Sequence, residues 1–429
     1  MSNARRVELV LEFSGFTVPD NLARHLLTAS YTDNEEDSTD DFQMSYDDRE
    51  RNLEGKWLEV KPTVVKTTTQ VQKTVQKQES INYVVKRGDT LWAIASRYLG
   101  SGTKYPQIAQ ENGIKNPNLI YPGQVFRITT GGTVSQTVTE TKQTTVRAAK
   151  PKMVKVKLIQ HNWHDTGKKA VLDCGTFELD SVQLAGPPLK GTLKGTSIPY
   201  TSTMRMQKKS RNWEKVTLKA IAQQIANEAG MKLLYECSDT PQYDKKEQVQ
   251  QSDIRFLQTL CHAEGKALKV TKMSVVVFDK EEYDQKPVVK TIKYGSADII
   301  SFRLSTKLTD AAYTSCHVSY TNTEKKQTIE YTYTPDSSVG TGQVLEVNER
   351  VANTAEAKRL AKKRLREKNA QEFTGSFTMV GDVQLVAGIV VRLKGFQHFD
   401  KKYRVKSAKH ELTGGYTTTI ELVQVLEGY

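Results

Sequence analysis

One stretch of the sequence, HNWHD, holds residue types that could bind a metal ion. Its candidate ligands are His161, His164 and Asp165. Two histidines and a carboxylate can bind zinc when their side chains converge on one point. The surrounding residues predict a strand, in which residues three positions apart point to opposite faces. His161 and His164 would therefore diverge, and we expect polar residues at a strand end before the Thr166-Gly167 turn, with no metal.

A second stretch places a thiol beside an imidazole, as a nucleophile and its base would require. Cys261 precedes His262, and both fall at the C-terminal end of a predicted helix. The helix dipole disfavours a thiolate at that end, so core packing is the favoured interpretation. The sequence also contains no GxxxxGK[ST], HExxH or GxSxG motif. We expect no enzyme, no catalytic residue and no cofactor.

Charge suggests anionic partners, because the 429 residues carry a formal net charge of +13. The basic segments MRMQKKSRNWEK and KRLAKKRLREK raise the question of nucleic-acid binding. A solvated basic face is the favoured interpretation, and we expect no specific nucleic acid as partner. The acidic run TDNEEDSTDD lacks the DxDxDG spacing of a calcium loop. It is interpreted as a solvated loop between strands or a charged docking edge.

Cysteine usage and hydropathy limit the class of protein further. The cysteines at 174, 237, 261 and 316 are widely spaced and form no CxxC pair, which indicates reduced thiols. No stretch approaches the roughly 20 apolar residues that span a bilayer, so we expect no membrane segment. The first residues, MSNARRVELVLEF, also lack the pattern of a cleavable signal peptide.

Strands dominate the elements that must position these features. Short strands at regular spacing in 1–60 and again in 151–210 predict a small barrel or sandwich, with Phe42, Met44 and Tyr46 alternating on one buried face. Two helix–glycine–strand units in 211–290 predict a central α/β layer. Residues 291–429 are strand-rich again, which predicts a second barrel-like domain, and they include a basic helix at 353–370. The apolar stripe of this helix is predicted to comprise Ala357, Leu360, Ala361 and Leu365.

Two matched segments interrupt the first strand-rich region. Residues 61–80 and 130–150 are rich in Thr, Gln, Val and Lys, and they bracket residues 81–129. They bury little apolar surface, as disordered linkers do. Their β-branched residues alternate, as in a two-stranded ribbon. Both interpretations remain open, and under either one the bracketed segment is an insertion.

The bracketed segment contains GDTL at Gly88–Leu91 and NPNLIYPGQ at Asn116–Gln124. With its flanking strands, Tyr83–Ile128 resembles a LysM domain, a βααβ module that binds glycans containing N-acetylglucosamine. The resemblance implies a groove between two loops. Its walls would be Gly88, Asp89, Thr90 and Leu91 on one side, and Asn116, Pro117, Leu119 and Ile120 on the other. A LysM domain that only packs against protein is the alternative.

The last third of the chain carries a second set of motifs, VQLVAGIVVRLKGF at Val383–Phe396, YRVKSAKH at Tyr403–His410 and GGYTTTIEL at Gly414–Leu422. Together with the split N-terminal strands and the central α/β units, they resemble the tail hub family. That family includes the phage late control D protein, myophage baseplate hubs and the barrel region of type VI spike proteins. The resemblance covers roughly 1–60 and 150–429.

The hub resemblance implies a mainly β fold with α+β parts. The expected parts are a first hub barrel (1–60 and 151–210), central α/β units (211–290), a second hub barrel (291–429) and the inserted LysM module. It also implies a homotrimeric ring with pseudo-six-fold symmetry that joins the hexameric tail tube to the central spike. A LysM inserted in the first barrel departs from the common family pattern.

The partners expected from this resemblance are further copies of the chain, the tail tube or tube-initiator protein, the central spike protein and other baseplate proteins. The LysM arm would bind either peptidoglycan or a neighbouring tail protein. Assembly in the bacterial cytoplasm would precede incorporation into the tail baseplate of a phage, a phage-tail-like bacteriocin (tailocin) or another contractile injection system. The alternatives are a cell-wall (peptidoglycan) binding protein whose functional module is the LysM, and, third, a peptidoglycan hydrolase with an unrecognised site.

Overall fold

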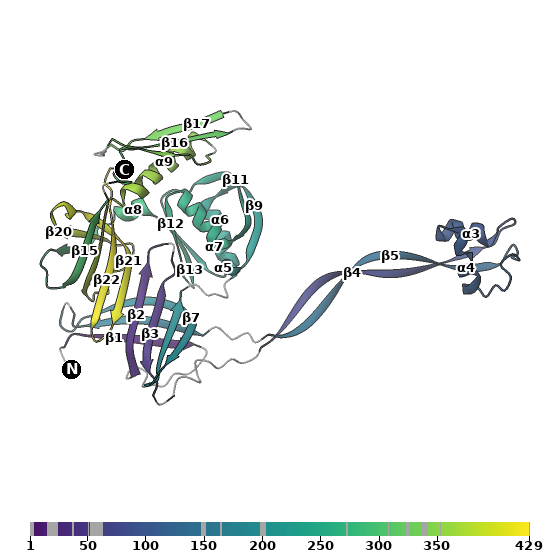
Figure 1. Ribbon diagram of the computed structural model, residues 1–429, viewed down its shortest axis with the longest axis horizontal. Coiled ribbons are helices and arrows are strands. Elements are labelled where there is room, and N and C mark those ends of the chain that lie inside the picture. Colours follow the sequence, from purple (N-terminus) through teal and green to yellow (C-terminus); the bar gives the residue numbers. More distant parts are fainter. Residues whose placement is uncertain are drawn as a thin grey trace. The chain divides into compact units, whose positions relative to one another are not determined.

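A computed structural model describes most of the chain. The described residues are 4–14, 25–36, 38–49, 51, 63–146, 152–163, 165–197, 203–271, 273–307, 309–322, 327–336, 342–351 and 353–428. The chain divides into two compact units (Figure 1). The large unit comprises 1–59 with 150–429, and the insert unit comprises 60–149.

One 12-stranded sheet forms the framework of the large unit. Its strands are β1 (Arg6–Ser14), β2 (Leu26–Asn34), β3 (Asp41–Asp47), β6 (Met153–His161), β7 (Lys169–Ala185), β8 (Lys190–Thr196), β14 (Val288–Lys293), β15 (Ile299–Thr306), β19 (Phe373–Val380), β20 (Val390–Lys394), β21 (Lys402–Leu412) and β22 (Tyr416–Gln424). The order is β1-β6-β7-β8-β3-β2-β21-β22-β19-β15, and β20 joins β14 to β21.

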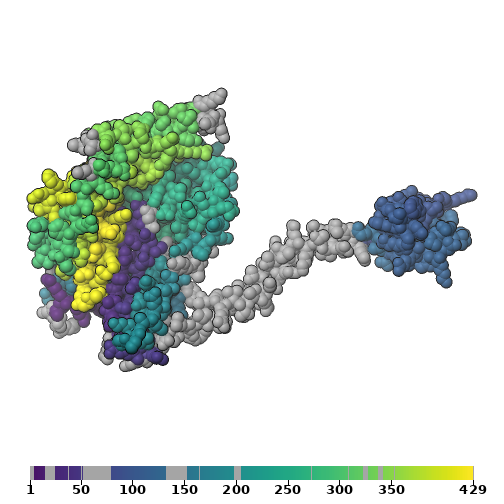
Figure 2. Space-filling model, in the orientation of Figure 1, coloured from purple at the N-terminus to yellow at the C-terminus, as the bar shows by residue number. Residues whose placement is uncertain are grey.

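The pairing of β2 with β21 joins strands from the two ends of the sequence. Figure 2 shows the yellow C-terminal strands lying against the purple N-terminal strands. The two expected barrels are therefore two halves of one continuous sheet. Among the described residues, the strand pairings of neither half close into a barrel.

Each half of the sheet has its own apolar core. Phe42, Met44 and Tyr46 of β3 are all buried, which confirms the alternation predicted from the sequence. They belong to the core of the first half, and Phe377 and Ile420 belong to the core of the second.

The central layer contains two helix–strand units, as predicted. Its elements are α5 (Thr203–Met206), β9 (Lys208–Thr217), α6 (Leu218–Glu228), β10 (Lys232–Glu236), β11 (Gln242–Ser252), α7 (Asp253–Ala263), β12 (Lys266–Val270), β13 (Ser274–Asp279) and α8 (Lys280–Asp284). Gly230 and Gly265 follow α6 and α7 with φ of 68° and 72°. Glycine adopts this left-handed conformation without a Cβ penalty, so it ends each helix.

The basic helix is α9 (Thr354–Asn369), which begins after its N-cap Asn353. It packs on a small sheet of β16 (Ser315–Asn322), β17 (Gln327–Tyr333) and β18 (Val344–Val347). Leu360, Ala361 and Leu365 are buried in the core between helix and sheet, which confirms the predicted apolar stripe.

The insert unit consists of a long ribbon and a helical module. Strands β4 (Thr63–Val84) and β5 (Val125–Val146) pair antiparallel over their whole length. The flanking segments left open as linker or ribbon thus form a ribbon over these residues. Between the two strands lie α3 (Leu91–Leu99), η1 (Gly102–Lys104) and α4 (Tyr105–Glu111), which complete a βααβ module.

Within the part of the chain that is described, no helix combines the length and the apolar character needed to cross a bilayer.

Candidate functional site

The loop before α3 forms the first wall of the expected glycan groove. Thr90 caps α3 with its side chain. The Asp89 carboxylate accepts hydrogen bonds from the backbone N–H of Lys86 (2.8 Å) and the hydroxyl of Tyr83 (2.7 Å), and these bonds lower the pKa of Asp89. Asp89 therefore holds the loop in shape. Gly88 and Thr90 remain exposed on its surface.

The second wall is the loop after α4. The side-chain oxygen of Asn116 accepts a hydrogen bond (3.1 Å) from the backbone N–H two residues later, which stabilises the turn. Leu119 is 55% exposed, whereas Pro117 and Ile120 are half-buried. An exposed leucine on a fixed loop offers the apolar contact that a sugar face requires.

The two walls are anchored on one apolar core. Leu91 is buried in that core and Ile120 packs against it, so Leu91 positions its loop instead of facing solvent. Trp92 and Tyr121 are both more than half exposed and directly follow these two residues. The sequence reasoning missed both aromatic residues, although each one adjoins a wall residue.

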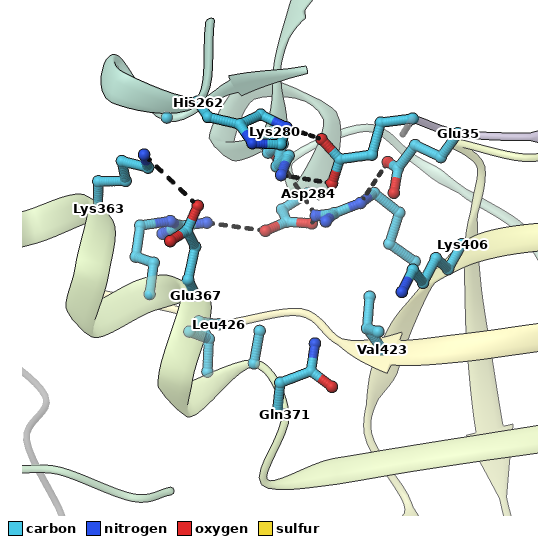
Figure 3. Close-up of a pocket in the computed structure, with 15 residues that line it drawn as sticks. Glu35, His262, Lys280, Asp284, Lys363, Glu367, Gln371, Lys406, Val423 and Leu426 are labelled. Carbon is cyan, nitrogen blue, oxygen red and sulfur yellow. Dashed lines mark hydrogen bonds and ion pairs between the residues drawn. The ribbon is translucent and has the colours of Figure 1, made fainter. Parts of the chain in front are cut away.

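A cluster of buried charges occupies the large unit, around a cavity of about 260 Å³ (Figure 3). Arg404 of β21 lies at its centre. Its guanidinium contacts the Glu35 carboxylate at 2.6 Å and also the Asp284 carboxylate of α8. Arg366 of α9 contacts the second oxygen of Asp284 at 2.7 Å. The sheet, the central layer and α9 are thereby joined through charged side chains.

Further pairs surround this centre. Lys280 contacts Glu36 at 2.5 Å, and His262 lies 3.5 Å from the same carboxylate. Burial raises the pKa of Glu35, and the positive charge of Arg404 opposes that rise. Acids and bases alternate among these side chains, so each charge named here has an opposite neighbour. This arrangement stabilises a junction between layers and presents no nucleophile.

Asp33, Glu35 and Asp40 of the acidic run are buried, which corrects the expectation of a solvated loop or docking edge for these three residues. Lys269 of β12 contacts Asp33 and, at 3.1 Å, Asp40. Burial raises the pKa of Asp40 to about 6. A carboxylate removed from water needs a partner, and the central layer supplies it here.

The basic segments are likewise paired within the chain. On α9, Arg359 contacts Glu264 at 3.0 Å and Lys362 contacts Glu281 at 2.8 Å. In the other basic segment, the paired residues are Lys209 and Arg211, with Glu228 and Asp253 as partners. Both α9 side chains stay partly exposed, at 40% for Arg359 and 34% for Lys362, so the basic face of α9 is solvated as well as paired within the chain.

The residues considered for metal or thiol chemistry have structural partners. His161 ends β6 with its Nε2 atom 2.8 Å from a carboxylate oxygen of Glu8, and Asp165 pairs with Lys168 at 2.8 Å. His164 lies outside the described residues. Cys261 is fully buried in α7, and burial raises its pKa to about 12. Among the described residues, no group of three or more His, Cys, Asp or Glu side chains could hold a metal ion.

Comparison with protein families gives two matches. Residues 83–129 match the LysM domain, and residues 198–416 match the phage tail baseplate hub (GPD) family. The second match covers half of the chain. The matched hub family is structural and not enzymatic.

Solved structures and known proteins add two further kinds of similarity. A tail protein from Neisseria meningitidis MC58 is 11% identical with a TM-score of 0.56, over 97% of this chain and 96% of that one. The 43 kDa tail protein of prophage MuSo2 from Shewanella oneidensis is 10% identical with a TM-score of 0.55, over 98% of each chain. These likenesses concern the fold.

An uncharacterized protein from Deinococcus radiodurans is 52% identical over 46 residues, 11% of this chain and 18% of that protein. The chain thus spans less than two thirds of that relative's length. The hub match, over 198–416, covers the central layer, α9 and most of the second half of the sheet. The charge cluster joins these three parts. The chain therefore belongs to the phage tail baseplate hub (GPD) family and carries a LysM domain.

Proposed function

We propose that this chain is the structural hub of a baseplate, in a phage tail, a phage-tail-like bacteriocin or another contractile injection system. Three copies form a ring that joins the hexameric tail tube on one face to the central spike on the other. The observation that carries the proposal is the hub family match over 198–416. Two similar halves of the sheet per copy, joined as β2 joins β21, would give the ring six similar parts.

The ring can be tested by negative-stain electron microscopy of the purified chain. A second variant replaces residues 61–150 with a short Gly/Ser link and so removes the insert. We expect three-fold rings from both proteins, because the proposed assembly uses the large unit, in which the hub family match lies. Single globular particles from both would contradict the proposal and favour the wall-binding alternative.

The LysM arm is proposed to bind the N-acetylated glycan of peptidoglycan through the loops at Gly88–Leu91 and Asn116–Ile120. The exposed side chains of Thr90, Asn116 and Leu119 support this reading, since they combine hydrogen-bonding groups with an apolar contact. The second candidate for the arm is a neighbouring tail protein. Both candidates use the same exposed loops.

A binding assay separates these candidates. Full-length chain is sedimented with purified peptidoglycan, and Leu119→Asp is compared with Val125→Asp, a matched change at another exposed apolar residue of the insert unit. Burying a leucine against a ligand contributes about 1.5–3 kcal/mol, so L119D should weaken binding by roughly tenfold or more. Absent binding by all three proteins would reject the glycan and leave the neighbouring tail protein. Equal binding by all three would reject Leu119 as a contact with the glycan.

A further inference from the structure

The two halves of the large sheet repeat one strand plan. Taken in chain order, β1, β2, β3, β6, β7 and β8 of the first half correspond to β14, β15, β19, β20, β21 and β22 of the second. In both halves the second strand pairs with the third, the third with the sixth, the sixth with the fifth, the fifth with the fourth, and the fourth with the first. One difference concerns the pairing of the first strand with the fourth. It is antiparallel in the first half (β1 with β6) and parallel in the second (β14 with β20).

Two β-bulges fix this correspondence residue by residue. The register of β2 against β3 shifts between Leu26 and Thr28, and that of β15 against β19 shifts between Ile299 and Ser301. The second bulge lies between Leu179 and Ser181 on β7, and between Val405 and Ser407 on β21. A bulge inserts one extra residue at a defined place, so matching bulges align the strands without ambiguity. Leu304 thus corresponds to Tyr31, and Leu184 corresponds to His410.

Within one chain, the halves are joined by β2 and β21. Six antiparallel pairs run from Ala29 opposite Leu412 to Asn34 opposite Ser407. The equivalent strands at the other junction are β15 and the second part of β7. Among the described strands, β15 pairs only with β19, and residues 181–185 of β7 pair only with β8. Figure 1 shows β15 at the left margin of the large unit, away from β7.

Both open edges expose apolar side chains. Ile300 and Phe302 on β15 are 56% and 45% exposed, and Leu184 on β7 is 36% exposed. An exposed strand edge with apolar residues is a template for pairing with another chain. Opposite charges favour the pairing of these two edges. Residues 302–307 carry two basic side chains, and residues 180–185 carry one acidic side chain.

We propose that β15 of one copy pairs antiparallel with residues 181–185 of β7 in the next copy. The register of β2 with β21, transferred to these strands, places Arg303 opposite Ala185, Leu304 opposite Leu184 and Ser305 opposite Gln183. The apolar pair of Leu304 and Leu184 then takes the place that Tyr31 and His410 occupy within the chain. The proposal rests on the proposed trimer and names the surfaces that form it.

A second copy is the occupant that fits both edges. The chain carries one β15 edge and one β7 edge, so the contact is head-to-tail and every copy offers both sides of it. A head-to-tail contact closes into a ring when the rotation between copies divides a full turn. Here the contact between copies repeats the geometry of the junction inside each copy. Three copies would therefore alternate six similar junctions around one ring.

Cysteine cross-linking tests this register. Ser305 and Gln183 are both exposed. Opposite residues of an antiparallel pair have Cα atoms about 4.5–5.5 Å apart, within reach of a disulfide. The double variant S305C/Q183C is oxidised and run on a non-reducing gel. The control S301C/Q183C places the thiols four residues out of register, roughly 13 Å apart along the strand. The parent chain controls for its native cysteines.

We expect covalent trimers from S305C/Q183C, and neither from the control nor from the parent. A mixture of the two single variants should give covalent dimers, which shows that the bond joins different copies. Light scattering of the parent chain distinguishes failure of this strand junction from failure of the proposed trimer. A trimeric parent without a cross-link in S305C/Q183C would overturn this junction and leave the trimeric hub standing. A monomeric parent without a cross-link would overturn both.

Discussion

The ring of Tyr31 stacks on the imidazole of His410, with centroids 6.0 Å apart and planes inclined by 14°. The pair lies where β2 meets β21, so it bridges the two halves of the sheet. His410 is buried, and its Nδ1 atom lies 2.7 Å from the hydroxyl oxygen of Tyr416. The junction that makes one sheet of two halves thus contains a titratable group that is shielded from water.

His410 should make the stability of the large unit depend on pH. Burial lowers its pKa to about 4 from an ordinary value of 6.5, although Asp33 and Asp382 favour the charged form. The unfolded chain therefore binds a proton at a higher pH than the folded chain. Stability is lost as the pH falls from 6.5 towards 4, by about 3 kcal/mol for a shift of this size. His410→Gln should flatten this loss, measured by urea unfolding at about pH 7 and about pH 4.5. An unchanged pH dependence in H410Q would assign the effect to other groups.

Arg404 should be the most costly member of the charge cluster to remove. Arg404→Leu leaves Glu35 and Asp284 buried without their central cation, and loss of one partner from a buried pair costs roughly 3–5 kcal/mol. Lys245→Ala is the matched control, because Lys245 pairs with Glu247 at 2.6 Å with both side chains more than half exposed. The control should lose little stability, because an exposed ion pair is screened by solvent. Equal losses in urea unfolding would mean that the cluster does not hold the layers together.

Gly191 should not tolerate a side chain. It lies on β8 opposite Tyr46, which is fully buried, and a Cβ at this position would overlap the tyrosine ring. Gly191→Ala should therefore lower the free energy of unfolding by about 1–3 kcal/mol, as overpacking does. Gly415→Ala is the control, since a Cβ there meets no atom within 4 Å. Thermal unfolding of the two variants measures the difference, and a stable G191A would show that the core of the first half can rearrange.

Local patterns in the sequence predicted the elements well. The alternation of Phe42, Met44 and Tyr46 identified a buried strand, and the spacing of Leu360, Ala361 and Leu365 identified the buried face of α9. Both patterns depend only on neighbours within a few residues, where the strand and helix periods apply. The motifs of the LysM loops are local in the same way.

Long-range partnerships could not be predicted from such patterns. The sequence predicted that Asp33 and Asp40 are solvated, because no basic residue lies near them in the sequence. Their partner, Lys269, lies more than 200 residues away. The continuous sheet was not predicted, because its two halves also join through residues that are far apart in the sequence. The pairing of Tyr31 with His410 joins the two ends of the chain, and spacing along the sequence carries no information about it.

We propose that the large unit assembles as a trimeric hub. Multi-angle light scattering of the full chain, and of the variant with residues 61–150 replaced by a short Gly/Ser link, tests it most directly. We expect three times the chain mass of 48.3 kDa for the full chain, and three times the reduced chain mass for the variant. Monomers in both cases would contradict it, and a trimer that disappears with the insert would move assembly to the LysM unit.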